Sequence, residues 1–412
     1  MISSSDSESV EARSAAPVLR TPVGATLQRV MLGAFYVFLA SEFFSIAVNS
    51  IALGVMAICW VLMMLVERKV LITRTPFDWF FLAYLVVQII TTVFSQDVVQ
   101  SIVFSKRLLL IGIVYFISTW IVTEALVKRT VVVLLGAGIA VSLIGLAKLV
   151  LSPPGEIVRL GIFQFYMTTS ELMMIAFLLL LPFAVMPRVP IKVRIVAAVT
   201  LLPVIVALYA TVTRGPFVAA VIGALVIALI ANRRLVIALV AGIAILFMFA
   251  SPYVLGRLES ITNIHHHDNQ TRLMLWRIGL ESFREHPVLG VGDTDLGDLI
   301  GRHMRPDDPI ERLGHMHNIV MQFLVTEGAV GLTAILLLFV AIVVAEARIF
   351  RRVQTHWFPA AVSLGAIAVF IGFQIAGLTD WTFGDQEVVI LFWISVGLSL
   401  AVNKVVPELP GS

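Results

Sequence analysis

Apolar residues of this chain recur in long runs that short polar segments separate. Most runs approach the length of about 17 to 25 residues that a helix needs to cross the hydrocarbon core of a membrane. A membrane-spanning strand would alternate apolar and polar residues over about ten positions, and no such alternation occurs in the sequence. The predicted spans are 30–48, 50–66, 77–94, 108–123, 130–151, 170–187, 193–212, 216–231, 235–250, 319–345, 359–378 and 387–404.

This pattern predicts an all-α polytopic membrane protein with about twelve transmembrane helices. The gap at 49–50 is short, so a single interrupted helix, and therefore eleven spans, is the alternative. Composition supports the class, because only 13% of the residues are charged, against about 25% in soluble globular chains. The chain has one cysteine, Cys59, which excludes an intramolecular disulfide and a cysteine-based zinc or redox site.

Polar residues gather in three places outside the spans. Residues 1–27 are rich in Ser, Ala and Glu and lack the apolar stretch of a signal peptide, so they predict a disordered cytoplasmic tail. Residues 251–318 form the one long polar loop, and loops of that length in compact proteins usually carry function. The expected organisation is a tail at 1–27, nine helices in 28–250, the loop 251–318, three helices in 319–405 and a second tail at 406–412.

Positive charge sets the orientation, because cytoplasmic loops of membrane proteins carry an excess of Lys and Arg. With the N-terminus inside, most basic residues of the short connections fall on the cytoplasmic side, and both termini are cytoplasmic. The short connections on the other side offer only Lys106, Arg107, Lys148, Arg159 and Arg214. The loop 251–318 is therefore expected in the periplasm, and the membrane is expected to be the bacterial inner membrane.

Within this loop, residues 271–285 (TRLMLWRIGLESFRE) have helical spacing. Leu273, Trp276, Leu280 and Phe283 fall on one face of that helix, which predicts a short helix at the outer membrane surface. Pro287 ends it, and the glycines that follow predict a turn.

Arg214 stands where one span ends outside and the next begins, in the segment Thr213-Arg-Gly-Pro216. A proline at the first helical position and the free N–H groups of a helix start favour a bound anion there. The guanidinium fork of Arg214 matches phosphate oxygens in pairs. The alternative is an arginine that only anchors its span at the interface.

Arg272 and Arg277 lie on the predicted loop helix, and His315 and His317 lie where the loop re-enters the membrane. An arginine at a helix start opposes the helix dipole, so an anionic partner would explain Arg272, although the local sequence alone favours a scattered charge on a surface helix. A histidine there can accept a proton near neutral pH or serve as a structural hydrogen-bonder.

Other motifs give weaker signals. Consecutive histidines, as in His265–His267, rarely converge on one ion, so no metal site is predicted. Asp293-Thr-Asp295 matches the pair of acids that metal-dependent sugar-nucleotide transferases use, but nucleotide sugars are not expected outside the cytoplasm, and the match is rejected. No phosphate-binding loop or dinucleotide fingerprint is found in the sequence, so it gives no support for a nucleotide cofactor.

Taken in order, these elements resemble the O-antigen ligase family of the ligase/polymerase superfamily. The resemblance rests on Arg214-Gly, Arg272 to Trp276, His286-Pro-Val-Leu-Gly-Val-Gly292, and His317-Asn318 followed by nine residues, Gly328, two residues and Gly331. The motifs extend over 214–331, and the late periplasmic loop extends the likeness to the whole chain. The family implies a fold similar to membrane glycosyltransferases of the C type.

The resemblance further implies transfer of a polysaccharide from undecaprenyl diphosphate to the lipid A–core oligosaccharide, in lipopolysaccharide biosynthesis. The reaction is taken to invert the anomeric centre without metal, ATP or another cofactor, and without nucleic acid. His317 matches the catalytic histidine, and Arg214 and Arg272 match the arginines that hold the donor diphosphate. Arg277, His315, Lys148, Arg159 and Arg107 are supporting candidates at the same membrane face.

Two rival functions remain. An O-antigen polymerase or a protein O-oligosaccharyltransferase would use the same donor with a different acceptor. A transporter of lipid-linked sugars would place charged, interrupted helices near the bilayer midplane, often as paired repeats. Here the charges gather at one face and no repeat is evident, which favours chemistry at the surface.

Overall fold

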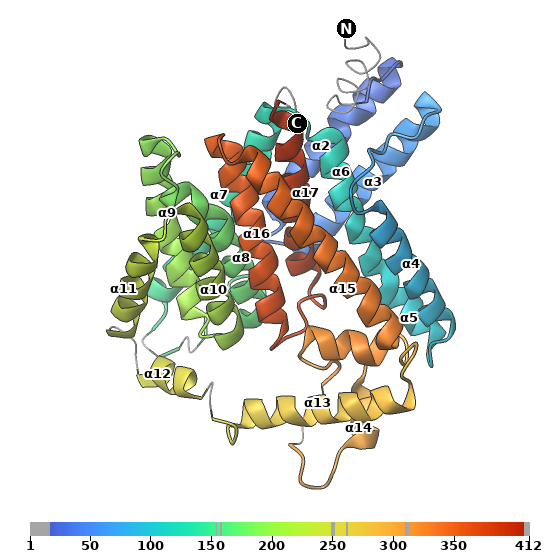
Figure 1. Ribbon diagram of the computed structural model, residues 1–412, viewed down its shortest axis with the longest axis vertical. Helices are drawn as coiled ribbons and strands as arrows, with labels where there is room; N and C mark the ends of the chain where they lie inside the picture. Colours follow the sequence, from blue (N-terminus) through green and yellow to red (C-terminus); the bar gives the residue numbers. More distant parts are fainter. Residues whose placement is uncertain are drawn as a thin grey trace.

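The computed structural model describes residues 17–153, 155–156, 159–248, 252–260, 263–309 and 313–407. Throughout these residues the regular secondary structure is helical. Figure 1 shows a bundle of long helices with further helices lying across one end of it. The elements are α2 (Pro22–Ser41), α3 (Ile46–Glu67), α4 (Asp78–Val93), α5 (Val98–Ser105), η1 (Lys106–Ile111), α6 (Gly112–Trp120), α7 (Glu124–Leu151), α8 (Tyr166–Val185), α9 (Ile191–Ala210), α10 (Arg214–Ala231), α11 (Leu235–Met248), α12 (Pro252–Glu259), α13 (His267–Glu285), α14 (Gly297–His303), α15 (Ile319–Val353), α16 (Trp357–Gly377) and α17 (Gln386–Val405).

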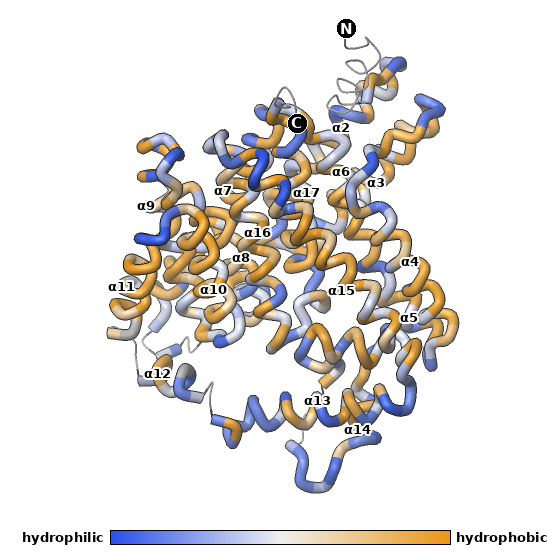
Figure 2. The backbone as a smooth tube through the Cα atoms, viewed as in Figure 1, coloured by the Kyte–Doolittle hydropathy of each residue, from blue (hydrophilic) through white to orange (hydrophobic). Residues whose placement is uncertain are grey.

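The predicted fold class is confirmed. Within the described residues, 10 helices are long and apolar enough to cross a membrane, with α5, η1 and α6 counted as one continuous stretch. Two shorter apolar helices, Asp78–Val93 and Leu235–Leu246, account for the remaining predicted spans. Figure 2 shows apolar residues along the bundle, with polar residues at its ends and along α13 and α14.

The first two spans differ from the prediction in their boundaries. Thr21 caps the start of α2 by accepting the Gly24 N–H at 3.0 Å, and Pro22 fits the first helical position, so this helix begins before residue 30. It ends at Ser41, and Ser45 caps α3. The connection therefore lies before Ile46, and α2 and α3 are two separate helices rather than one interrupted helix. Residues 1–16 and 408–412 of the two predicted tails lie outside the described residues.

Three helices form the centre of the bundle. Most residues of α8, α16 and α17 are buried by their neighbours, whereas α2 and α3 leave many apolar side chains exposed. Such outward apolar faces are expected where helices contact lipid rather than protein. The central helices matter for the site because the connection between α16 and α17, residues 378–385, reaches the end of the bundle that α13 crosses.

The predicted loop helix is present as α13, and it also buries a second face that the sequence analysis did not name. Met274, Leu275 and Ile278 pack into a second apolar core with the loop and the start of α15, while Leu273 and Leu280 are exposed. Packing against α14 and α15 buries this second face.

A break in α15 holds the loop against the bundle. Gly328 has φ 66° and ψ −164°, which interrupts the helix. The freed backbone groups pair with the turn after α13: the Ala329 N–H donates to the Pro287 carbonyl at 2.9 Å, and the Val291 N–H donates to the Val325 carbonyl at 2.9 Å. The backbones approach so closely that a Cβ on Gly328 would collide with the Val288 carbonyl. These contacts explain why glycine occupies position 328.

Replacing Gly328 with Ala is expected to lower the free energy of unfolding by about 1–3 kcal/mol, because the backbone conformation there is essentially restricted to glycine. Thermal unfolding of the detergent-solubilised protein measures the change. Gly54→Ala is the matched control, since nothing lies within 4 Å of the added methyl group and its backbone is helical. Equal stability of the two variants would show that the break in α15 tolerates a side chain.

Candidate active site

The three residues that the sequence singled out lie around one cavity. Its volume is about 330 Å³, and its lining comes from α13, from the first turns of α8 and α10, and from the connection between α16 and α17. Arg214 comes from the start of α10, Arg272 from α13, and His317 from the segment before α15. The cavity is lined by Arg159, Tyr166, Met167, Thr213, Arg214, Gly215, Pro216, Arg257, Asp268, Thr271, Arg272, Leu313, His317, Thr379 and Asp380.

Arg214 is held rigidly at the start of α10. Its Nη1 donates to the Ser260 hydroxyl at 2.7 Å, and its Nη2 lies 3.2 Å from Asp268 Oδ2. Gly215 and Pro216 also line the cavity, so the first turn of α10 faces the same space. A helix start and a guanidinium group that face one cavity make a site suited to an anion.

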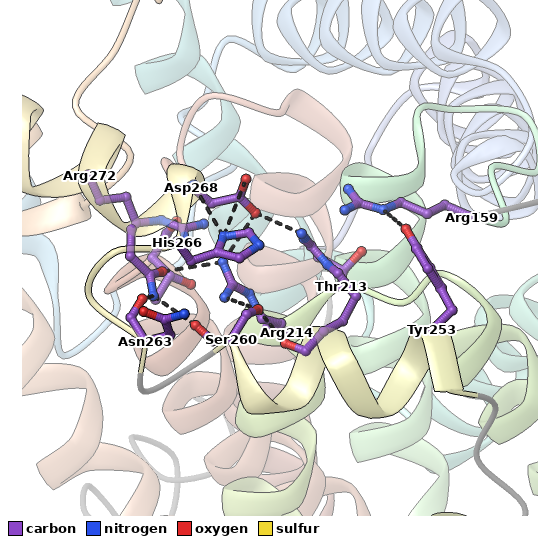
Figure 3. A network of polar contacts seen from close by, with 12 residues as sticks. Arg159, Thr213, Arg214, Tyr253, Ser260, Asn263, His266, Asp268 and Arg272 are labelled. Atoms are coloured by element: carbon purple, nitrogen blue, oxygen red, sulfur yellow. Dashed lines mark hydrogen bonds and ion pairs between the residues drawn. The ribbon is translucent and has the colours of Figure 1, made fainter. Parts of the chain in front are cut away.

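Two further arginines, Arg159 and Arg257, line the same cavity, and Figure 3 shows Arg159. Arg159 lies over the Tyr166 ring, 4.6 Å from its centroid, and its Nε donates to the Tyr253 hydroxyl at 3.4 Å. Arg257, on α12, reaches Asp268 Oδ2 at 3.0 Å. Arg159 is one of the supporting candidates predicted from the sequence. Arg257 is not, because nothing in its local sequence separates it from an ordinary surface charge.

Arg272 is fixed by the connection between α16 and α17. Its Nε donates to the Thr379 carbonyl at 3.1 Å. Burial lowers the pKa of the Arg272 guanidinium, although the nearby carboxylates of Asp380 and Asp268 act against it. No hydrogen bond to the described residues engages its two terminal nitrogens, so that part of the fork can bind a ligand.

His317 is paired with an acid that sequence reasoning missed. Its Nδ1 lies 3.0 Å from Asp380 Oδ1, and its backbone adopts φ 44°, which is uncommon for a residue with a side chain. Burial acts to raise the pKa of Asp380, but the hydrogen bond and charge of His317 outweigh it, and the pKa lies below its usual value. With the proton on Nδ1 directed at this carboxylate, Nε2 is left to accept a proton from a substrate.

Asn318 explains how the chain presents His317. Its side chain caps α15 by accepting the N–H groups of Val320 and Met321, at 2.9 and 3.0 Å. Its amide also donates to the Leu378 carbonyl at 2.9 Å, which ties the start of α15 to the connection that carries Asp380. The His-Asn pair of the motif therefore has a structural basis.

His315 lies beside His317, with ring centroids 4.0 Å apart. Burial, together with the charge of His317, lowers the pKa of His315 to about 4. The ligand atoms of His315, His317 and Asp380 lie within 4.8 Å of one another, so this group could also hold a cation. The predicted absence of a metal therefore needs an experimental test at these residues, not only at His265–His267.

The other supporting candidates do not line the cavity. Arg107 lies in a separate buried cluster, 3.7 Å from Asp293, with its guanidinium over the Trp381 ring. Arg277 forms ion pairs with Glu281 and Asp308. Lys148 donates to the Gly161 carbonyl at 2.7 Å. In these positions the three cations organise the surrounding chain.

The weaker motifs also have structural roles. Asp295 accepts the Gly297 N–H at 2.8 Å at the start of α14, and Asp293 pairs with Arg107, so both acids of Asp293-Thr-Asp295 are engaged within the protein. His266 caps α13, and its ring accepts the Asp268 N–H at 3.3 Å.

Comparison with known families identifies this part of the chain. The sequence model of the family described as O-antigen ligase matches residues 199–336. That segment runs from α9 to α15 and contains Arg214, Arg272 and His317. No curated protein matches the chain. Residues 199–336 are therefore similar to the O-antigen ligase family, and the ordered motifs of the sequence lie largely in the same segment.

Proposed function

We propose that this protein is an O-antigen ligase, which transfers a polysaccharide from undecaprenyl diphosphate to the lipid A–core oligosaccharide on the periplasmic face of the inner membrane. The match to the O-antigen ligase family supports a ligase or polymerase activity on a lipid-linked glycan in general terms. The finer proposal rests on one observation: Arg214, Arg272 and His317 line a single cavity at one end of the bundle.

Arg214 and Arg272 stabilise the leaving group, which is the lipid diphosphate. The donor already stores its driving force in the bond between sugar and diphosphate, so catalysis requires stabilisation of charge on the departing oxygens. Arg214, Arg272 and the first turn of α10 supply that stabilisation in a partly buried site, where electrostatic interactions are stronger than in water. Neither ATP nor a metal is needed for this step.

His317 activates the nucleophile, which is a hydroxyl group of the acceptor. Its Nε2 removes the proton of an acceptor hydroxyl while the hydroxyl oxygen attacks the anomeric carbon from the side opposite the diphosphate. The new glycosidic bond forms as the bond to the diphosphate oxygen breaks, which inverts the anomeric centre. Asp380 orients the imidazole and stabilises its charged form, as an acid paired with a catalytic histidine does elsewhere.

Sibling enzymes remain the nearest alternative. A polymerase would extend the donor glycan itself, and a protein O-oligosaccharyltransferase would use a protein acceptor, with the same arginines and histidine. The spacing from His317 and Asn318 to Gly328 favours the ligase. A transporter is the more distant alternative and would form no glycosidic bond.

A purified-component assay separates these functions. The full chain in detergent is mixed with a glycan linked to undecaprenyl diphosphate and with lipid A–core, and products are resolved by mass. A ligase attaches the glycan to lipid A–core. Lengthening of the donor glycan alone would identify a polymerase, and transfer that requires an added pilin-like protein would identify an oligosaccharyltransferase.

Replacing His317 with Ala is expected to abolish transfer in this assay, because loss of a general base costs about 10²–10⁴-fold in rate. Donor binding and expression should change little. His265→Ala, an exposed histidine on the same loop, is the control and should retain normal activity. Near-normal transfer by the His317 variant would remove it as the base.

Arg214→Lys and Arg272→Lys are each expected to lower kcat/KM at least about tenfold, because lysine keeps the charge but loses the paired hydrogen bonds of the guanidinium fork. Initial rates at varied donor concentration measure the effect. Arg284→Lys, an exposed position on α13, is the control. If both variants work normally, the assignment of the diphosphate site is wrong.

Transfer is expected to continue at full rate after dialysis against a chelator. The measurement is the initial rate with and without excess EDTA, followed by addition of Mg²⁺, Mn²⁺ or Zn²⁺ to test for recovery. An absolute requirement for one of these ions would contradict a metal-independent mechanism. It would direct attention to His315, His317 and Asp380, and reopen the case for His265–His267.

A further inference from the structure

Asp268 lies between Arg214 and Arg257 of the candidate site, and its approach to Arg214 is seen in Figure 3. A single carboxylate oxygen, Oδ2, lies 3.2 Å from Arg214 Nη2 and 3.0 Å from Arg257 Nη1. The arginine side chains are 9% and 17% exposed, whereas the Asp268 side chain is 37% exposed. The carboxylate is thus the more accessible partner in this arrangement.

Positive charge exceeds negative charge around the cavity. Arg159, Arg214, Arg257 and Arg272 line it. The acids among the described lining residues are Asp268 and Asp380, and Asp380 is engaged with His317. Asp268 therefore offers one charge to several guanidinium groups, and an anion of higher charge would satisfy them better.

Arg257 has unused capacity to bind an anion. Its Nη1 reaches Asp268, but its Nε is buried and has no hydrogen-bond partner among the described residues. A buried donor without a partner costs free energy that a ligand can recover. The two-oxygen edge of a phosphate can accept from both Nε and a terminal nitrogen of the same guanidinium group, which a carboxylate oxygen held at one nitrogen does not do.

We propose that Asp268 is an internal ligand of the anion site formed by Arg214 and Arg257, and that a phosphate group of the donor displaces it. Arg257 then becomes a third phosphate-binding arginine beside Arg214 and Arg272. This inference rests on the proposed function, in which a lipid diphosphate enters the cavity. It adds a binding residue and a competition that the proposed reaction does not require.

The position of Asp268 on α13 makes the exchange feasible. Asp268 lies in the first turn of the helix, where a carboxylate is stabilised by the helix dipole even after its arginines leave it. Arg272 follows four residues later, so both side chains lie on the same face of α13. A donor phosphate that binds Arg272 therefore releases Asp268, on the same face of α13. When the cavity is empty, the Asp268 carboxylate neutralises part of the charge of Arg214 and Arg257.

A purely structural role for Asp268 predicts the opposite result from the one expected here. If the carboxylate only orients Arg214 and Arg257, its loss weakens the binding of an anion. If it competes with the anion, its loss strengthens binding. The sign of one measured change therefore distinguishes the two roles.

The experiment measures the affinity of the full-length protein in detergent for inorganic pyrophosphate by calorimetric titration. Asp268→Asn keeps the size of the side chain and removes its charge, and we expect it to tighten binding about tenfold, a free-energy difference of about 1.4 kcal/mol. Asp307→Asn is the matched control, because it removes one negative charge from an exposed position of the same loop and should change affinity less than about twofold.

Arg257→Gln tests the second half of the proposal. It should weaken pyrophosphate binding about tenfold in the native background and in the Asp268→Asn background. Should Asp268→Asn prove unstable, Asp268→Ser removes the same charge. Weaker or unchanged binding in the Asp268 variants relative to the Asp307 control would overturn the proposal, as would an Arg257 variant that binds normally or a native protein that does not bind pyrophosphate. A protein that binds as expected but forms no glycosidic bond would refute the proposed function and leave the anion site standing.

Discussion

The candidate site depends on α13 being held across the end of the bundle, because this helix brings Arg272 and Asp268 to residues that come from the bundle itself. Two kinds of interaction hold it. Apolar side chains such as Leu275 and Ile278 pack into a core with the start of α15, and Arg272 donates to the Thr379 carbonyl. The apolar core stabilises the packing of α13 but is non-directional, whereas the hydrogen bond fixes which face of α13 meets the cavity. The exposed residues Leu273 and Leu280 are then left on the outside.

A second constraint fixes His317 by way of the backbone. The break at Gly328 turns the first part of α15, and the turn after α13 pairs with the backbone groups that the break frees. Asn318 then anchors the start of this short segment to the connection between α16 and α17. The unusual backbone of His317 is therefore over-determined by its neighbours, which is the condition under which a strained residue persists at a functional position. The conformation of His317 therefore depends on the backbone break at Gly328, the glycine of the same motif.

The sequence predicts the membrane-spanning helices more completely than it predicts the residues of the site. Long apolar runs predict the spans because a membrane demands continuous hydrophobic helices, and only their ends shift when caps such as Thr21 and Ser45 decide the boundaries. The order of the motifs along the chain predicts Arg214, Arg272 and His317 as residues of the site. The sequence does not predict Asp380 or Arg257. Asp380 acts through His317, which is distant in sequence, and nothing in the immediate neighbours of Arg257 distinguishes it from an ordinary surface charge.

The electrostatics of the cavity argue for surface chemistry more strongly than the position of any one residue. Several guanidinium groups near one another repel, and at the edge of a membrane that repulsion is less well screened than in water. A transport pathway would gain from charges that release their ligand readily at successive depths, whereas here the cations line one cavity beside a histidine and its acid. A site of this kind is suited to a multiply charged anion, with a candidate proton acceptor, His317, beside it. Those are the two requirements of a transfer in which a diphosphate leaves as a hydroxyl attacks.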